Sequence, residues 1–302
     1  MQAAHRAGLP GQRWHFQHGP IDLVIGADGT PAAVHASHDA AWNRFASILG
    51  ELVSELAALR APVGQTCPLH GPVARRMWQA CHPFRAEFIT PMAAVAGAVA
   101  QELIGCYQRE GVARAWINNG GDIALHLVGS AHVAVGLCSD LARFDPQAGD
   151  VPLDLDFEVR AAMPVRGIAT SGWRGRSHSR GIADSVTVLA ATAAQADAAA
   201  TVIANAVNVE DPRVVRRPAC ELKDDSDLGA LPVTVLVPSL PHALVREALS
   251  RGRARAQALH RHGLIHAAFL VCQRQVASVP PRPYDAPDSP EIEGRALGSL
   301  FA

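Results

Sequence analysis

The chain has 302 residues, a formal net charge of −1, 49% hydrophobic residues and 5% aromatic residues. This length and apolar content are enough to bury a substantial core, so we expect a globular protein of one large domain or two modest ones. The near-neutral charge gives no general attraction to nucleic acid or to an anionic membrane surface, and the low aromatic content argues against a stacking platform for single strands.

The first sixty residues are predicted to form a small antiparallel sheet and then one long helix. Residues 13–17 and 21–26 have the composition of strands. The turn sequence AlaAspGlyThr at 27–30 leads to a third predicted strand over 32–35. Over 40–60 the apolar residues recur at helical spacing. We expect this helix to cover one face of the sheet.

Two more helices are predicted before residue 110. A short helix over 73–81 is stopped by Pro83. The run over 89–107 is apolar and rich in alanine and glycine, with Pro91 at a position typical of a first helical turn. Polar residues interrupt this run, and no other stretch reaches membrane-spanning length, so we interpret it as a buried helix that lies close to its neighbours.

The second half of the chain is predicted to alternate strands and helices. Strands over 113–118, 123–128 and 132–138 form a meander, and alternation over 153–159 places three carboxylates on one face. That face is interpreted as solvated, with a metal site as the alternative. The remaining elements are strands over 185–190, 232–237 and 264–272, and helices over 193–208 and 241–259. We expect one domain over 1–276 and a flexible extension over 277–302.

The six cysteines form no CxxC pair, and several lie in apolar runs. Reduced thiols and a cytoplasmic location are therefore expected. The N-terminus has no apolar core of signal-peptide length, which agrees with that location. Cys67 and His70 have the spacing of half a zinc site, but no second pair completes it.

The segment WINNGGDIAL over 116–125 breaks an apolar run with two asparagines, two glycines and an aspartate. Glycine allows a ligand to approach the main chain closely, so the loop is a candidate cradle for an anionic group. An ordinary hairpin with a glycine turn is the alternative.

Two further segments carry candidate chemistry. Asp197 and Thr201 are four residues apart on a predicted helix, and their oxygens are of the type that Mg²⁺ prefers. The alternative is that Asp197 favours the positive end of its helix and Thr201 bonds back to a carbonyl. GIATSG over 167–172 precedes an arginine-rich loop that could clamp phosphate or carboxylate, and His178 in that loop could act as an acid or base. A solvent-exposed basic loop is the alternative.

Taken in order, these motifs resemble a known family. NNGGDI over 118–123, GIATSG over 167–172, and SVTVLA followed by ADAAAT between 185 and 201 are similar to motifs of the ApbE superfamily, the FAD:protein FMN transferases. PMAAVAGAVA over 91–100 and the HS-x-x-x-AD segment before VTVLA match the UPF0280 branch more closely. The three ordered motifs together are far more specific than any one of them.

The resemblance implies an α+β domain with an ApbE-like fold, in which antiparallel sheets pack with helices. It implies magnesium held by Asp197 and Thr201 against the diphosphate of FAD, with FAD or FMN as the flavin cofactor. It also implies a flavin site lined by Asn118, Asn119, Gly120, Gly121 and Asp122 and by Thr170, Ser171 and Gly172. Asp122 and His178 are then the candidate catalytic residues. An acceptor hydroxyl would attack the phosphorus on the FMN side, and AMP would leave.

The chain departs from the transferases in one segment. They carry a longer stretch after TSG, with paired histidines and an Asp-Pro, whereas here only a short segment containing His178 separates Trp173 from Ser185. Two alternatives therefore stay open beside FMN transfer: an enzyme of different chemistry that acts on a small anionic or pterin-like metabolite, and a ligand-binding module without turnover. We expect a small-molecule or nucleotide-like ligand, no nucleic acid and no membrane, with a homodimer as the default for a cytoplasmic enzyme.

Overall fold

The computed structural model describes residues 3–137, 155–175 and 177–281. Its strands are β1 His5–Leu9, β2 Arg13–His18, β3 Ile21–Gly29, β4 Val112–Asn119, β5 Asp122–Leu127, β6 His132–Leu137, β7 Leu155–Arg160, β8 Gly167–Ser171, β9 Ser185–Ala190, β10 Val215–Pro218, β11 Pro232–Leu236, β12 Ala267–Cys272 and β13 Gln275–Val279. Its helices are α1 Pro31–Ser54, α2 Leu56–Leu59, α3 Pro72–Cys81, α4 Val95–Ile104, α5 Ala193–Ala206, α6 Ala219–Leu222 and α7 His242–Arg261, with 3₁₀ turns η1 His82–Phe84, η2 Pro91–Ala94 and η3 Gly105–Tyr107.

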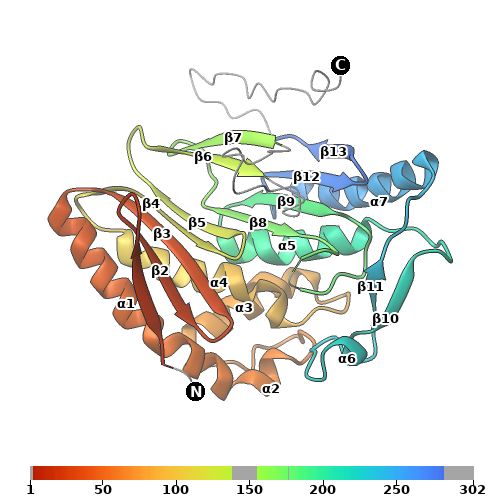
Figure 1. Ribbon diagram of the computed structural model, residues 1–302, viewed down its shortest axis with the longest axis horizontal. Helices are drawn as coiled ribbons and strands as arrows, with labels where there is room; N and C mark the ends of the chain where they lie inside the picture. The colour runs from red at the N-terminus through yellow and green to blue at the C-terminus, as the bar shows by residue number, and fades with distance from the viewer. Residues whose placement is uncertain (1–2, 138–154, 176, 282–302) are drawn as a thin grey trace.

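One large sheet organises the molecule (Figure 1). Its nine strands follow the order β1-β2-β3-β4-β5-β8-β9-β12-β13, and every neighbouring pair is antiparallel. The hairpins β6-β7 and β10-β11 form two small separate sheets. This mixture of helices with antiparallel sheets confirms the predicted α+β class.

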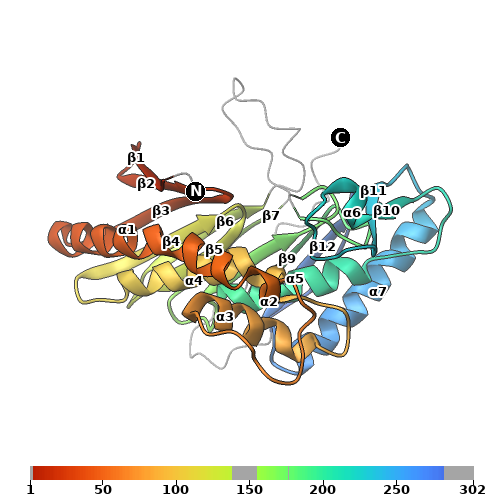
Figure 2. The same ribbon diagram turned by 90° about the horizontal axis from the view of Figure 1, so that it is seen from below.

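Helices cover one face of the large sheet, as Figure 2 shows from below. Helix α1 contacts β2 and β3, α4 contacts β4 and β5, α5 contacts β8 and β9, and α7 contacts β12 and β13. The main core lies between these layers. Successive strand residues face opposite sides, so Ala169 of β8 joins the main core, whereas Ile168 joins a smaller core under β6 and β7.

Helix α5 shows how local sequence sets an element. Its first turn is capped by Thr192, whose Oγ1 accepts a hydrogen bond from the Gln195 N–H at 3.3 Å. This cap sets the start of the helix at Ala193. Alanines occupy most of its buried positions, and small side chains allow α4 to pack close against it.

Two predictions about strands are wrong. Residues 32–35 form the first turn of α1 instead of a strand, because Thr30 is extended and Pro31 starts the helix with its φ already helical. Residues 132–138 were expected to continue the meander, but β6 pairs with β7 and leaves the large sheet, so that β5 pairs with β8. Strand β1 at the sheet edge was not predicted.

The last strand extends past the boundary drawn from the sequence. Strand β13 reaches Val279, three residues into the segment expected to be a flexible extension, and residues 282–302 lie outside the described residues. A tight turn precedes it, with Gln273 and Arg274 at φ of 46° and 66°. The Gln273 N–H in this turn donates to Asp184 Oδ2 at 2.5 Å, which fixes the loop before β9 to the end of the sheet.

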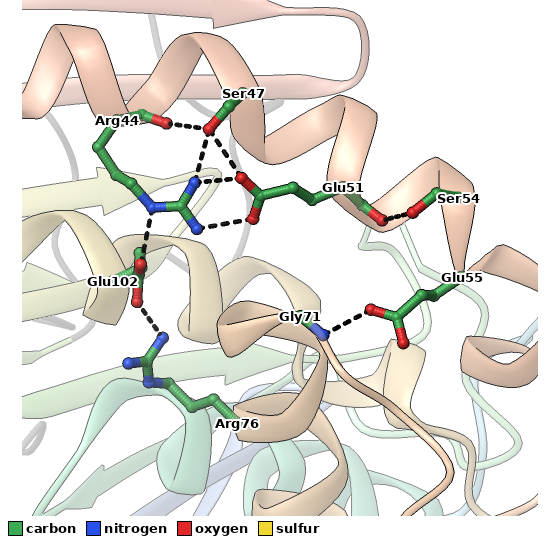
Figure 3. Close-up of polar contacts among 8 residues, drawn as sticks. All are labelled: Arg44, Ser47, Glu51, Ser54, Glu55, Gly71, Arg76 and Glu102. Atoms are coloured by element: carbon green, nitrogen blue, oxygen red, sulfur yellow. Dashed lines mark hydrogen bonds and ion pairs between the residues drawn. The ribbon is translucent and has the colours of Figure 1, made fainter.

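A network of charged side chains ties three helices together on the covered side (Figure 3). The Arg44 guanidinium of α1 binds both carboxylate oxygens of Glu51 at 2.6 and 2.8 Å and donates from Nε to Glu102 Oε1 of α4 at 2.8 Å. Arg76 of α3 donates to the other oxygen of Glu102 at 2.6 Å. Burial alone would raise the pKa of Glu102, but the two guanidinium groups outweigh it and lower that pKa. The network fixes α4, whose N-terminal turn enters the site described next.

Candidate functional site

The NGGD segment is a tight hairpin between β4 and β5. Asn119 pairs with Asp122, and the two residues between them, Gly120 and Gly121, have φ of 65° and 112°. Two consecutive positive φ angles are typical of a two-residue hairpin turn, and glycine adopts them without strain. The Gly121 N–H donates to Asn118 Oδ1 at 2.8 Å, so this amide is already bonded within the turn. The hairpin alternative is therefore correct for the backbone.

The two polar residues that flank the turn connect it to other elements. Asn119 is buried and donates from Nδ2 to the Ala96 carbonyl in the first turn of α4, at 3.1 Å. Asp122 is 9% exposed and accepts the Thr170 N–H of β8 through Oδ1 at 3.2 Å. The turn is thus held between α4 and the end of β8.

Asp197 enters the same place from α5. Its Oδ2 accepts the Gly97 N–H of α4 at 2.9 Å. Gly97 allows this contact because a Cβ at that position would lie 2.4 Å from the Ala193 carbonyl oxygen and 2.9 Å from the Asp197 Cβ. The first-turn amides of a helix lack internal partners, so the carboxylate also caps α4 from a neighbouring helix.

Both carboxylates have raised pKa values, and the charge of Asp122 affects the ionisation of Asp197. Burial raises the pKa of Asp122 to about 7, and the hydrogen bond from Thr170 only partly offsets it. Burial also raises the pKa of Asp197 well above its usual range, and the charge of Asp122 raises it further against the hydrogen bonds from Gly97 and Ala96. Among the described residues, no cationic side chain offsets either charge. Two desolvated carboxylates without a cation are costly unless one is protonated or a cation binds.

Thr201 lies one helical turn beyond Asp197 on α5, and its side chain is partly exposed. The pair is therefore presented on one face of the helix, as the spacing predicts. Four residues further on, the helix face continues toward Asn205, which is also partly exposed.

Of the three TSG residues, Thr170 and Ser171 belong to strand β8. Thr170 Oγ1 is 2.8 Å from Thr187 Oγ1 of β9, on the sheet face opposite Ser171. Gly172 alone follows the strand, and a Cβ there would lie 2.2 Å from the Asp184 carbonyl oxygen. The end of β8 therefore reaches the carboxylate pair mainly through its backbone, at the Thr170 N–H.

His178 lies in the loop between β8 and β9, away from Asp197 along α5. The adjacent Ser179 donates to Asn205 Oδ1 at 3.3 Å, and the Arg180 N–H donates to the same oxygen at 2.9 Å. Asn205 is eight residues after Asp197, which corresponds to about 12 Å of helix. The loop is therefore anchored near the C-terminal end of α5, and the assignment of His178 as catalytic stays a prediction. Arg176 lies outside the described residues.

The sequence did not single out the neighbours of Asp197 on α3 and beyond. Burial raises the pKa of the Cys81 thiol well above its usual range, and the charges of Asp197 and Asp227 raise it further. Asp227 in turn accepts a hydrogen bond from Thr90, just before η2. The alanine- and glycine-rich run over 91–100 was the available signal, since such residues mark a close approach of two helices.

Other candidate metal residues are not brought together. In the described ranges no group of three or more His, Cys, Asp or Glu residues is arranged to hold a metal ion. Of the acidic row on β7, Asp156 is exposed, while Asp154 lies outside the described residues, as does Cys138. The five described cysteines are free thiols. No helix in the described part of the chain has the length and apolarity needed to cross a membrane.

Comparison with known proteins places this chain in a family. The family model described as "AbpE bacteria" matches residues 5–278. A UPF0280 protein of Methanopyrus kandleri is 36% identical over 153 residues, which cover 51% of this chain and 56% of that protein. A UPF0280 protein of Methanosarcina barkeri is 32% identical over 197 residues, which cover 65% of this chain and 72% of that protein. The chain thus spans about half the length of the first relative and more of the second.

Solved structures give a more distant likeness. The apo flavinyl transferase ApbE of Pseudomonas stutzeri has a TM-score of 0.45 and 13% identity, over 92% of this chain and 94% of that one. The flavin transferase ApbE of Vibrio cholerae has a TM-score of 0.43 and 11% identity, over 91% and 97%. The match of the family model over nearly the whole chain, together with the UPF0280 relatives, shows that this chain belongs to the ApbE-like family, in its UPF0280 branch.

Proposed function

We propose that this protein binds a flavin nucleotide together with Mg²⁺ and transfers FMN from FAD to an acceptor hydroxyl. The observation that carries the proposal is the meeting of Asp122 and Asp197, two desolvated carboxylates from different elements, beside Thr201. Strongly perturbed carboxylates are typical of functional sites, because a purely structural role rarely requires uncompensated buried charge. The family to which the chain belongs gives this site its flavin interpretation.

The residues fit a hard divalent cation. In the described part of the chain, Asp197 accepts only from the backbone donors of Gly97 and Ala96. A carboxylate has about four lone-pair sites, so acceptor capacity remains for a metal. The Thr201 hydroxyl and backbone carbonyls would supply further oxygen ligands of the kind that Mg²⁺ prefers, with water completing the shell. A cation here would also offset the repulsion between Asp122 and Asp197 that raises the pKa of Asp197.

Each group then has a distinct part in the transfer. Bound magnesium would neutralise charge on the diphosphate. Asp197 and Thr201 would hold the ion, while the hairpin turn and the end of β8 would line the flavin nucleotide. The acceptor oxygen would form a bond to the FMN-side phosphorus, the bond to the AMP oxygen would break, and AMP would leave. Asp122, with a pKa of about 7, is suited to take the proton from the acceptor hydroxyl near neutral pH.

The test is release of AMP from FAD. The purified protein is incubated with FAD, MgCl₂ and a peptide that contains serine and threonine, and AMP and flavinylated peptide are measured by chromatography and mass spectrometry. We expect AMP and modified peptide in equal amounts, and none in the presence of EDTA. Absence of AMP with both Mg²⁺ and Mn²⁺ contradicts the transferase activity, while flavin binding is measured separately by fluorescence polarisation of FMN.

Matched variants assign the roles. Asp197→Asn keeps an acceptor for the Gly97 N–H but removes the charge, so we expect Mg²⁺-dependent activity to fall about 100-fold or more with the fold preserved. Thr201→Val removes one oxygen ligand and should raise the Mg²⁺ concentration needed for half-maximal activity. His178→Ala tests the remaining catalytic candidate: an unchanged rate excludes His178 as the essential base.

A further inference from the structure

A cavity lies at the C-terminal half of α5, where Asn205 lines it one helical turn beyond Thr201 on the face that also carries Asp197. Its volume is about 480 Å³. The cationic residues that line it come from three separate segments: Arg180 from the loop between β8 and β9, Arg216 from β10 and Arg255 from α7. Asn205 and Asn208 line it from the end of α5 and the residues that follow.

Hydrogen bonds fix the walls of this cavity. The Asn205 Oδ1 atom accepts the Arg180 N–H at 2.9 Å, and Asn208 donates from Nδ2 to the Arg180 carbonyl at 3.2 Å. Arg216 donates from Nη2 to Asn208 Oδ1 and to the Val209 carbonyl. Arg255 pairs with Glu87 through Nη2. Much of the cavity wall is therefore ordered before a ligand arrives, which lowers the entropic cost of binding one.

Several donors at this cavity still lack an acceptor. The Nε–H of Arg255 is buried and has no hydrogen-bond partner among the described residues. Within the same described ranges the Arg180 guanidinium makes no hydrogen bond or ion pair, although its backbone is bonded on both sides. The Asn205 carboxamide uses its oxygen and leaves its Nδ2 donor available. A buried unpaired donor is costly, and a ligand that accepts from it removes that cost.

We propose that this cavity is a binding site for a phosphate group carried by a small molecule, separate from the Asp122–Asp197 site. Guanidinium donors bind phosphate with charge-assisted hydrogen bonds, often two from one arginine. Donors that come from three separate segments around a cavity suit a tetrahedral group with three or four oxygens better than a carboxylate with two. The site goes beyond FMN transfer, because its residues do not include the metal-binding pair.

The opposing charges at this cavity provide the sharpest test. Glu87 accepts a hydrogen bond from Arg255. Glu210 also lines the cavity, but it is exposed and has no ion pair with a described residue. Removing a cation and removing this anion should therefore change phosphate affinity in opposite directions. Arg180→Gln should weaken phosphate binding, and Glu210→Gln should strengthen it.

The experiment measures thermal protection of the whole chain by inorganic phosphate, in EDTA and at constant ionic strength. A ligand that binds only the folded state raises the melting temperature, and the concentration dependence gives an apparent Kd. We expect Arg180→Gln to raise that Kd about tenfold and Glu210→Gln to lower it severalfold. Arg75→Gln is the matched control, because Arg75 is an exposed arginine of α3 outside this cavity.

The outcomes separate this site from the proposed flavin site. Asp197→Asn should leave the phosphate response unchanged, whether or not the protein turns out to transfer FMN. Equal Kd values for the wild type, Arg180→Gln and Glu210→Gln, with melting temperatures without phosphate unchanged, would overturn the proposal. Equal protection by acetate would overturn the assignment to phosphate.

Discussion

Two groups of acidic side chains lie along α4, on the helix-covered side of the sheet, and they have opposite surroundings. Glu102 of α4 receives hydrogen bonds from Arg44 and Arg76, and its pKa is lowered although burial opposes that change. Asp122 and Asp197 meet close to the other end of α4, where the described residues offer them only backbone donors, and both pKa values are raised.

The contrast shows how a structural charge network at one end of α4 differs from a candidate site at the other end. In the Glu102 network each partly buried charge is matched by an opposite charge, so the network can fix α1, α3 and α4 relative to one another. At Asp122 and Asp197 no cationic side chain among the described residues matches the anions, and the proposed function assigns that part to a bound Mg²⁺. Uncompensated charge lowers the stability of the apo protein, and a site that binds a cation recovers this cost on binding.

The largest expected effect comes from breaking the compensated network. Glu102→Ala leaves the guanidinium groups of Arg44 and Arg76 without their shared partner, at side-chain exposures of 23% and 27%. We expect a loss of about 3 kcal/mol in the free energy of unfolding, because a partly buried charge is left unpaired. Urea denaturation measures it. Glu102→Gln keeps an acceptor and should lose less; an equal loss for both variants would show that packing dominates.

The next effect concerns the close approach of α4 and α5 at Asp197. Gly97→Ala places a Cβ 2.4 Å from the Ala193 carbonyl oxygen, so the two helices must separate. We expect a destabilisation of about 2 kcal/mol, together with weaker Mg²⁺ binding by calorimetry. Gly105→Ala is the control, because a Cβ there meets no atom within 4 Å and the residue is already helical at φ −56°. Equal stability of the two variants would contradict the predicted crowding.

The uncompensated pair should give the apo protein a characteristic pH dependence. Since the folded pKa of Asp122 is raised to about 7, the folded state holds a proton that the unfolded state has already released above pH 4. The contribution of this group to stability therefore decreases as the pH rises from about 4 to about 7 and is constant above that.

Asp122→Asn removes that contribution while keeping an acceptor for the Thr170 N–H. We expect the variant to be more stable than the wild type at pH 8, by on the order of 1 kcal/mol, and to differ little at pH 4. Urea denaturation at both pH values, in EDTA, measures the difference. Saturating Mg²⁺ should reduce the gain at pH 8, because the cation stabilises the ionised wild-type pair. A gain that is the same at both pH values would contradict ionisation of Asp122 as its cause.

Much of this fold could be predicted because its signals are local. Strand β9 and the start of α5 follow from an apolar run, the Thr192 cap and a stretch of alanines. The start of α1 could not be predicted, because AlaAspGlyThr reads equally as a hairpin turn and as the approach to a helix that begins at Pro31. The exit of β6 from the sheet depends on pairing with β7, whose start lies 18 residues beyond the end of β6.

The candidate site also has one part that could be predicted from local sequence and another that depends on distant contacts. The i, i+4 spacing of Asp197 and Thr201 can be read from the sequence, and the structure keeps both on one helix face. The hydrogen bond from Gly97 to Asp197 joins residues 100 apart, and no spacing rule indicates it. The same is true of the arginine-lined cavity, whose residues come from separate segments and become neighbours only after folding.

The smallest expected effect on stability concerns an ion pair that is exposed to solvent. Arg251 and Glu247 of α7 form an i, i+4 ion pair at 2.6 Å, with side-chain exposures of 52% and 49%. Water screens such a pair, so Glu247→Ala should cost at most about 0.5 kcal/mol, and about 0.5 M NaCl should reduce even that. If the loss approached that of Glu102→Ala, burial would not be what distinguishes the Glu102 network, and the pKa contrast with Asp122 and Asp197 would need another cause. A small, salt-sensitive loss would instead support burial as the property that decides how strongly a paired or unpaired charge along α4 affects stability.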